Sequence, residues 1–196
     1  MTSKIKVNIL ADGGDNSIIT SDGAGSFTAS SSLASSVQSV GGLQNTPAFR
    51  VYRDSTQTIT DNTFTKVQFN GVSFDTNSGF DTATNYRYTI PSGEGGSYFF
   101  YGQWFFSRTT NGPYATRCQL YKNGSAVQDF AIGFLTSFTS LDAFTNPVSF
   151  IDNNASAGDY YEIFAYQNNS SNTSNNIFGD ASGLFTNFGG YKLIGA

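Results

Sequence analysis

Short runs of alternating apolar and polar residues, each followed by a turn signal, fill the chain from residue 46 onward. The alternation is clear at Phe49 and Val51, and helix-length amphipathic periodicity is absent. Turns such as Asn70-Gly71 and Asn123-Gly124 separate the runs. The pattern predicts strands at 47–53, 65–74, 86–90, 97–107, 115–122, 126–135, 147–152, 159–167 and 185–194, and a further short one near 57–60. Strands this short and this numerous predict an all-β, antiparallel jelly-roll sandwich of about ten strands.

The first 45 residues follow a different pattern. An apolar run and a turn recur at a pitch of about nine residues, starting at Asn8, Ser17 and Ser26. Units this short cannot bury their own apolar face, so the segment needs a partner surface, either two further copies or a larger structure. The alternative is a chance pattern in a Ser/Gly-rich linker. We therefore expect a short, extended, β-rich anchoring or oligomerisation segment at 1–45 and a head at 46–196. The anchor residues would be Ile5, Val7, Ile9, Ile18 and Phe27.

The strand expected at 97–107 carries aromatic rings on both faces. An exposed strand of an antiparallel sandwich normally presents polar residues to solvent, so a second subunit is expected to cover the outer face. Closure about an axis allows a homotrimer. The alternative is a monomer with rings scattered over its surface. The residues expected in the trimer interface are Tyr98, Phe100, Trp104, Phe106, Phe188 and Tyr191.

Composition narrows the classes of partner. The chain has 19 Phe and 11 Tyr, only 12% charged residues and a net charge of −4. Its five Lys and five Arg are scattered singly, which argues against a nucleic-acid interface that would need a basic stripe. No apolar run reaches the ~20 residues of a membrane span. We therefore expect neither nucleic acid nor membrane as a partner.

Residue types also argue against catalysis. The chain has no histidine, which excludes histidine-dependent triads and proton shuttles. It has only two glutamates, Glu94 in an expected turn and Glu162 in an expected strand, and most aspartates neighbour turn residues. The single cysteine, Cys118, is expected to be a small buried residue. We predict a protein that is not an enzyme and has no cofactor.

Two polar segments are candidate binding features. Asp75, Asn77 and Asp81 alternate around a glycine as in a calcium loop, although the same residues suit a tight turn and no bidentate Glu follows. The longest polar run, at 167–176, is expected to form an exposed tip. Its amides at Asn168, Asn169 and Asn172 would either contact a host surface glycan or simply be solvated.

The head carries a recognisable series of residues. Phe69, Asp75, Phe80 and Tyr88 precede the run Gly96-Ser97-Tyr98-Phe99-Phe100. Gly158 then leads into Asp159-Tyr160-Tyr161-Glu162, and the chain closes with Phe188-Gly189-Gly190-Tyr191-Lys192-Leu193. The series, over about residues 47–196, resembles the globular head of the complement first component and its relatives in the tumour necrosis factor superfamily. The resemblance implies a ten-stranded jelly roll that forms a compact homotrimer through flat aromatic faces and serves display and binding.

The N-terminal segment adds a second resemblance. Because it lacks a Gly-X-Y period, it does not look like collagen. A short Asp/Gly/Ser-rich β segment joined to such a head looks like virion proteins of tailed bacteriophages. We therefore expect a homotrimeric decoration protein, cement or head fibre, on the outer surface of the virion, with residues 1–45 bound to the major capsid protein or another virion protein. The alternatives are a receptor-binding protein at a tail or fibre tip and a free carbohydrate-binding module.

Overall fold

The computed structural model describes residues 9–11, 13–21, 23–24, 26–30, 45–107, 115–134, 143–169 and 174–193. The chain divides into two compact units, residues 1–44 and 45–196. Every regular element in the described part is a β-strand, and all strand pairs are antiparallel apart from one isolated parallel bridge. Within the described residues, no helix has the length and apolarity to cross a membrane. The predicted all-β antiparallel class is confirmed.

The N-terminal unit is a three-stranded sheet of very short strands. Its order is β1 (Ile9–Ala11), β2 (Ser17–Ser21) and β3 (Phe27–Ala29). The register places Leu10, Ile19 and Ala29 in one row across the three strands. Leu10 is 51% exposed, so this row is not covered within the described part of the chain.

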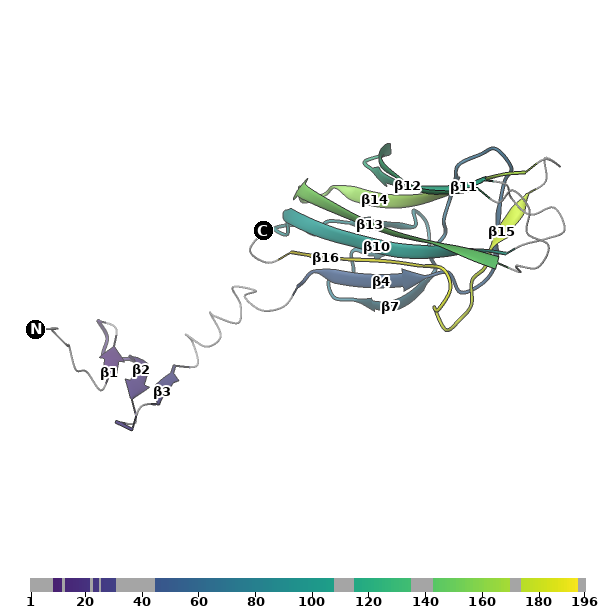
Figure 1. Ribbon diagram of the computed structural model, residues 1–196. Coiled ribbons are helices and arrows are strands. Elements are labelled where there is room, and N and C mark those ends of the chain that lie inside the picture. The colour runs from purple at the N-terminus through teal and green to yellow at the C-terminus, as the bar shows by residue number, and fades with distance from the viewer. Residues whose placement is uncertain are drawn as a thin grey trace, which may run out of the picture. The chain divides into compact units, whose positions relative to one another are not determined.

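The head contains a seven-stranded sheet built around one long central strand. Its strands are β4 (Ala48–Tyr52), β5 (Gln57–Ile59), β7 (Gly71–Asp75), β10 (Gly96–Ser107), β13 (Ala143–Ala155), β15 (Asn175–Ile177) and β16 (Asn187–Lys192). The hydrogen-bonded order is β5-β15-β10-β16-β4-β7, and β13 also pairs with β10. The strands β13, β10, β16, β4 and β7 lie side by side in that sequence (Figure 1).

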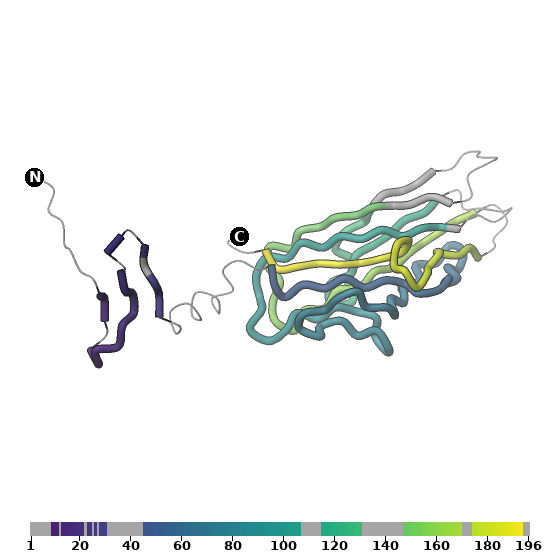
Figure 2. Tube along the Cα trace, turned by 90° about the horizontal axis from the view of Figure 1, so that it is seen from below, coloured from purple at the N-terminus to yellow at the C-terminus, as the bar shows by residue number. Residues whose placement is uncertain are grey.

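A six-stranded sheet forms the second layer. Its strands are β6 (Thr65–Lys66), β8 (Phe80–Asp81), β9 (Arg87–Thr89), β11 (Ala115–Lys122), β12 (Ser125–Phe134) and β14 (Tyr160–Asn168). The order is β12-β11-β14-β9-β8, with β6 pairing β14. The long strands of both sheets run along the length of the head (Figure 2).

The core lies between these two sheets and is dominated by rings. Tyr98, Phe100, Trp104 and Phe106 project from one face of β10 and are at most 1% exposed. Phe100 lies 4.3 Å, centroid to centroid, from Tyr161 on β14, which joins the two layers. Cys118 is fully buried, as predicted, and burial raises the pKa of its thiol well above the usual value. Full burial of large rings supplies most of the hydrophobic stabilisation of such a sandwich.

The strand predicted at 65–74 is in fact two short strands in different sheets. β6 pairs with β14 in the six-stranded sheet, and β7 pairs with β4 in the seven-stranded sheet. Between them, Val67 and Phe69 alternate inward and are completely buried. Alternation persists through the crossing because the segment still packs against the core, so periodicity alone could not reveal the change of sheet.

Two further boundaries differ from the prediction. β13 spans Ala143–Ala155, whereas the expected strand covered only 147–152. β15 lies at the end of the polar run that was expected to be an exposed loop, and its Asn175 is 1% exposed. The polar composition hid this strand because its buried amides are satisfied by hydrogen bonds, such as the one that Asn175 Nδ2 donates to Gln167 Oε1 at 3.1 Å.

Candidate self-association surface

The outward face of the seven-stranded sheet is aromatic. Phe99 and Tyr101 alternate along β10 with the core rings and are half-buried. Phe99 lies 5.4 Å from the ring of Tyr191 on β16 and 6.2 Å from that of Tyr101. Because one side of these rings faces away from the core, the rings form a continuous apolar surface across two neighbouring strands.

The register shows how far this surface extends. Three cross-strand rows follow one another along the sheet, each running from β13 across β10 and β16 to β4, and two of them continue to β7. Of the residues in these rows, Arg50 is the one that carries a charge. The rows are Ile151–Phe99–Tyr191–Ala48, Ser149–Tyr101–Gly189–Arg50–Phe74 and Pro147–Gln103–Asn187–Tyr52–Gly71.

Glycines flatten this face. A Cβ at Gly189 would lie 2.6 Å from Cζ of Tyr101, and one at Gly71 would lie 2.3 Å from Cε2 of Tyr52. Contacts this short leave no room for a side chain, so each tyrosine ring lies directly over bare backbone. Burial raises the pKa of Tyr101, and the nearby Arg50 opposes that shift. Because the rings of Tyr101 and Tyr52 lie on glycine backbone, the surface is broad and has few protruding side chains.

The rim of the same face is more exposed. Ile151 on β13 is 56% exposed and Phe74 on β7 is 44% exposed. Arg50 is held in place because its guanidinium donates to Ser73 Oγ at 3.1 Å and to the Gly183 carbonyl at 2.9 Å. An immobilised guanidinium at the side of an aromatic surface limits how a partner can lie on it.

At one end of β10 the aromatic surface continues into a cluster of three rings. Phe105 lies 5.0 Å from Phe185 and 6.3 Å from Phe178, and Phe178 lies 4.8 Å from Phe185 in an edge-on geometry. The neighbouring Leu184 is 67% exposed. Gln103 fixes this loop by donating its Nε2 hydrogens to the carbonyls of Leu184 and Phe185, at 2.7 and 2.9 Å.

Most of the predicted interface residues do not lie on this surface. Five of them are at most 1% exposed in the single chain, so they cannot contact a second copy. This part of the prediction is wrong. These five are Tyr98, Phe100, Trp104, Phe106 and Phe188. Tyr191 lies on the outward face, and Phe99 and Tyr101 were missed although they alternate with the predicted set. Both faces of β10 are aromatic, so hydrophobicity could not decide which one points inward.

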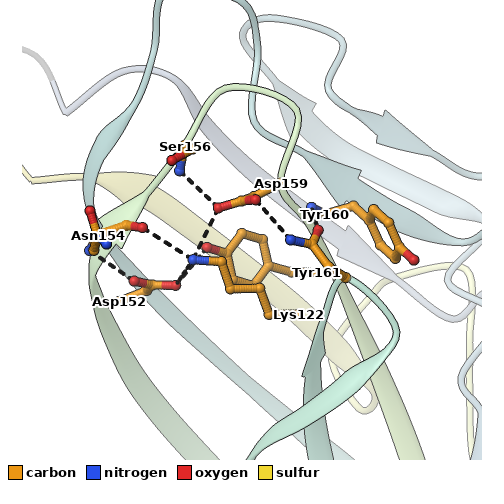
Figure 3. A network of polar contacts seen from close by, with 8 residues as sticks. Lys122, Asp152, Asn154, Ser156, Asp159, Tyr160 and Tyr161 are labelled. Atoms are coloured by element: carbon orange, nitrogen blue, oxygen red, sulfur yellow. Dashed lines mark hydrogen bonds and ion pairs between the residues drawn. The ribbon is translucent and has the colours of Figure 1, made fainter.

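A polar network centred on Lys122 joins the two sheets at one end of the head (Figure 3). The ammonium group of Lys122, on β11, donates to Asp152 Oδ2 on β13 at 2.8 Å and to the Asn154 carbonyl at 3.1 Å, and it pairs with Asp159 Oδ2 at 3.0 Å. The Tyr161 hydroxyl, on β14, donates to the same Asp152 oxygen at 2.7 Å. All three ammonium hydrogens therefore have acceptors.

The Asp159 carboxylate also accepts hydrogen bonds on both of its oxygens. Asp159 accepts hydrogen bonds from the Ser156 amide and from Asn123 Nδ2, both at 2.8 Å, and Asn123 Oδ1 accepts from the Tyr160 amide at 3.0 Å (Figure 3). These bonds tie the β11–β12 hairpin to the β13–β14 turn. With every carboxylate oxygen of the pair engaged, the network stabilises the fold and presents no free acid or base.

The ionisation of this network follows from the same contacts. Burial acts to raise the pKa of Asp152 and of Asp159, but the hydrogen bonds that each accepts outweigh it and hold both pKa values below the usual one. Burial likewise acts to lower the pKa of Lys122, and its bonds to the two carboxylates raise that pKa overall. The network is therefore charged across the neutral pH range.

The calcium candidates serve as turn residues. Asp75 accepts hydrogen bonds from the backbone amides of Gly79 and Phe80, at 3.1 and 2.8 Å. Asp81 accepts hydrogen bonds from the backbone amides of Thr84 and Ala83, both at 2.9 Å, and these bonds lower the pKa of its carboxyl. Each carboxylate thus caps its own turn. In the described residues no three His, Cys, Asp or Glu side chains come together as a possible metal-binding group.

The predicted tip is only partly exposed. Asn169 is 3% exposed and donates to Gln167 Oε1 at 3.1 Å, so the prediction that it lies at an exposed tip is wrong. Asn168 is half-buried and donates to Asn62 Oδ1 at 2.5 Å. Asn172 lies outside the described residues. The buried Gln167 needs polar partners, and the adjacent asparagines supply them.

The predicted anchor residues are described only in part. Ile9 on β1 is 53% exposed and Ile18 on β2 is half-buried. Phe27 belongs to β3, where its backbone is opposite Ser21. Ile5 and Val7 lie outside the described residues. The anchoring role itself stays a prediction.

Known structures resemble this chain in fold. No protein-family model matches the sequence, and no curated protein matches it significantly. The globular domain of a zebrafish complement 1qA protein is 19% identical, with a TM-score of 0.52 over 75% of this chain and 97% of that domain.

Two tumour necrosis factor-like structures are similar to the same degree. Eiger TNF from S. frugiperda is 11% identical, with a TM-score of 0.54 over 76% of this chain and 93% of that one. Murine APRIL is 13% identical, with a TM-score of 0.52 over 74% of this chain and 98% of that one. At these identities the likeness establishes the fold, a complement 1q/tumour necrosis factor-like jelly roll.

Proposed function

We propose that this chain is a non-enzymatic structural protein of a tailed bacteriophage virion. It would decorate the outer surface of the capsid as a homotrimer, as a cement or head-fibre protein, with residues 1–45 binding the major capsid protein or another virion protein. The observation that carries the proposal is the outward face of β10, β16 and β4, which is aromatic, flat and nearly free of charge.

Self-association is the simplest use of that face. Interface cores are enriched in Tyr and Phe and depleted in charged residues, which is the composition of the three cross-strand rows. Soluble monomers rarely leave an apolar surface of this kind uncovered. A closed ring of three copies buries one such face per subunit around a common axis.

The N-terminal unit supplies the support for anchoring. Its strands have three to five residues, and Ile9 and Leu10 are each about half exposed. A sheet of this size does not bury enough apolar surface to be stable alone, so it requires a partner surface. A capsid protein would provide that surface.

The polar groups of the head support a role without catalysis. The chain has no histidine. The most enclosed acid–base cluster, around Lys122, is fully hydrogen-bonded within itself. Such groups hold the fold together and are not poised for proton transfer to a substrate.

The direct test is cryo-electron microscopy of the phage particle that is assembled in the presence of this chain. The proposal predicts threefold heads on the outer capsid surface, each connected to the shell by density for residues 1–45. Particles that lack the chain altogether contradict the proposal, and density at the tail tip assigns the chain to the alternative role.

That alternative is a receptor-binding protein at a tail or fibre tip, or a free carbohydrate-binding module. It is favoured by a separate group of rings on the outward face of the six-stranded sheet.

A further inference from the structure

The outward face of the six-stranded sheet also carries aromatic rings. Tyr121 on β11 and Phe164 on β14 lie 4.2 Å apart, centroid to centroid, with their planes 36° apart. Phe64, just before β6, lies 5.0 Å from Tyr166 on β14 at the same interplanar angle. All four rings are half-buried, and the solvent side of an antiparallel sheet is normally polar.

Polar side chains alternate with these rings across the strands. The register places Arg117 opposite Tyr166 and Gln119 opposite Phe164. Gln119 Nε2 donates to Asp129 Oδ2 at 3.0 Å, and Arg117 pairs with the same carboxylate oxygen. Arg117 and Asp129 keep about a third of their side-chain area exposed, although Arg117 Nε itself is buried without a hydrogen-bond partner.

A second group of polar atoms lies beside Tyr166. The Tyr166 hydroxyl donates to Asn62 Oδ1 at 2.9 Å, and Asn168 Nδ2 donates to the same oxygen. The Asn62 backbone has a φ of 54°, a conformation that asparagine tolerates in turns. Tyr166 is therefore fixed in place, with donors and acceptors on two sides of its ring.

The charges of this face are paired. Arg117 pairs with Asp129, and Lys66 pairs with Glu162 at 2.5 Å. A polyanion would meet two carboxylates here, and a purely apolar partner would bury these charged groups away from water, which costs free energy. A ligand suited to the face must combine an apolar surface with many uncharged hydrogen-bonding groups.

We propose that this face, around Tyr166, Phe64, Arg117, Gln119 and Asp129, binds a neutral saccharide. A pyranose ring has an apolar C–H face that packs on aromatic rings and a rim of hydroxyl groups. The hydroxyls would accept from Arg117 and donate to Asp129 as charge-assisted hydrogen bonds, and they would accept a neutral hydrogen bond from Gln119. The site lies within one chain, so the inference does not depend on self-association, and it would supply the receptor contact of the alternative function.

The test uses the full chain on an array of neutral oligosaccharides and their sialylated or uronic-acid counterparts, followed by saturation-transfer NMR with the strongest neutral binder. The wild type is expected to bind neutral glycans in preference to acidic ones. Tyr166→Ala is expected to weaken per-site affinity by about tenfold or more, since one stacked ring contributes on the order of 1.4 kcal/mol, which is that factor. Tyr166→Phe is expected to retain most of the affinity because it keeps the ring.

Two controls keep the outcome interpretable. Gln119→Ala removes one hydroxyl contact without disturbing a ring, and we expect it to weaken neutral-glycan binding while thermal unfolding stays unchanged. Phe178→Ala removes an exposed ring from the other side of the head. Because that ring adjoins the proposed self-association face, the variant is read by per-site affinity in the NMR measurement, and this affinity is expected to be unchanged. Binding to no neutral glycan, binding to acidic glycans only, or full binding by folded Tyr166→Ala overturns the proposal. In the last case the rings serve as cross-strand pairs that stabilise the sheet.

Discussion

The outward faces of the two sheets of the head are both aromatic, and they differ in the charged residues that lie among the rings. On the seven-stranded sheet, Tyr101 lies over the bare backbone of Gly189, and the cross-strand rows contain one charged residue, Arg50. On the six-stranded sheet, cations lie near the rings, with Arg117 5.4 Å from the centre of Phe64 and Lys66 5.7 Å from that of Phe164.

Ring content alone therefore does not identify a subunit interface. A face that is buried against another copy gains from flatness and from the absence of charges that would need desolvation. A face that keeps ion pairs beside its rings remains compatible with water. On this basis we propose self-association for the first face and ligand contact for the second.

The largest expected effect comes from placing a charge on the flat face. Tyr101→Asp would bury one unpaired carboxylate per subunit, at a cost of about 3–5 kcal/mol each. We expect the variant to fold and to sediment as a monomer in analytical ultracentrifugation. The matched variant Tyr166→Asp, on the other face, is expected to keep the wild-type mass; if both variants dissociate equally, the distinction between the faces is lost.

The second effect separates folding from association. Lys122→Met leaves the carboxylates of Asp152 and Asp159 without their shared cation, and the three side chains are at most 20% exposed. We expect the free energy of unfolding to fall by about 2–3 kcal/mol in urea titrations. The number of subunits in the oligomer should not change, because the network lies between the two sheets of a single chain. A change in subunit number with unaltered stability contradicts this assignment.

The Lys122 network illustrates what the sequence could not predict. Its three charged members are separated by 7 to 37 positions along the chain and form no motif. Only the packing of the sheet that holds β13 against the sheet that holds β11 and β14 brings them together. By contrast, alternation located most strands of the head, because period-two patterns report directly on burial. The strand from 97 to 107 shows the limit of that signal, since both Phe99 and Phe100 are rings and only the opposing layer decides which one is buried.

The turn residues show a second limit. Asp75 and Asp81 match the spacing of a calcium loop, yet each carboxylate turns toward the amides of its own backbone. A spacing rule describes which residue types are present, and it does not describe where their oxygens point. The resemblance of the whole head to a complement and tumour necrosis factor-like fold was the more robust signal, because many core positions contribute to it.

A third prediction concerns the pH dependence of the same network. The lowered pKa values of Asp152 and Asp159 contribute stability that is present above their unfolded pKa of about 3.9 and is lost as the pH falls through the folded values. The raised pKa of Lys122 contributes stability that is present below its unfolded value of about 10.4 and is lost as the pH rises through the folded one.

The stability difference between the wild type and Lys122→Met should therefore be constant from about pH 5 to about pH 9 and should shrink on both sides of that window. Chemical denaturation at a series of pH values measures this difference directly. A difference that stays unchanged at pH 2 contradicts a contribution of the Lys122 contacts to the lowered aspartate pKa values.

The smallest effect is expected at the rim of the flat face. Phe74 on β7 is 44% exposed and neighbours Arg50 across the strand pair. Rim residues contribute little to association, so Phe74→Ala should weaken it by less than about 1 kcal/mol, seen as a shift of the dissociation midpoint on dilution. Complete dissociation by this variant would move the centre of the interface from β10 to β7.

The most direct test of the whole account is the mass of the native full-length protein, measured by size-exclusion chromatography with multi-angle light scattering at micromolar concentration. The account predicts a single species with three times the mass of one chain, and a head in which Phe99, Tyr101 and Tyr191 are protected from solvent. A stable single chain with these three rings open to water would contradict it.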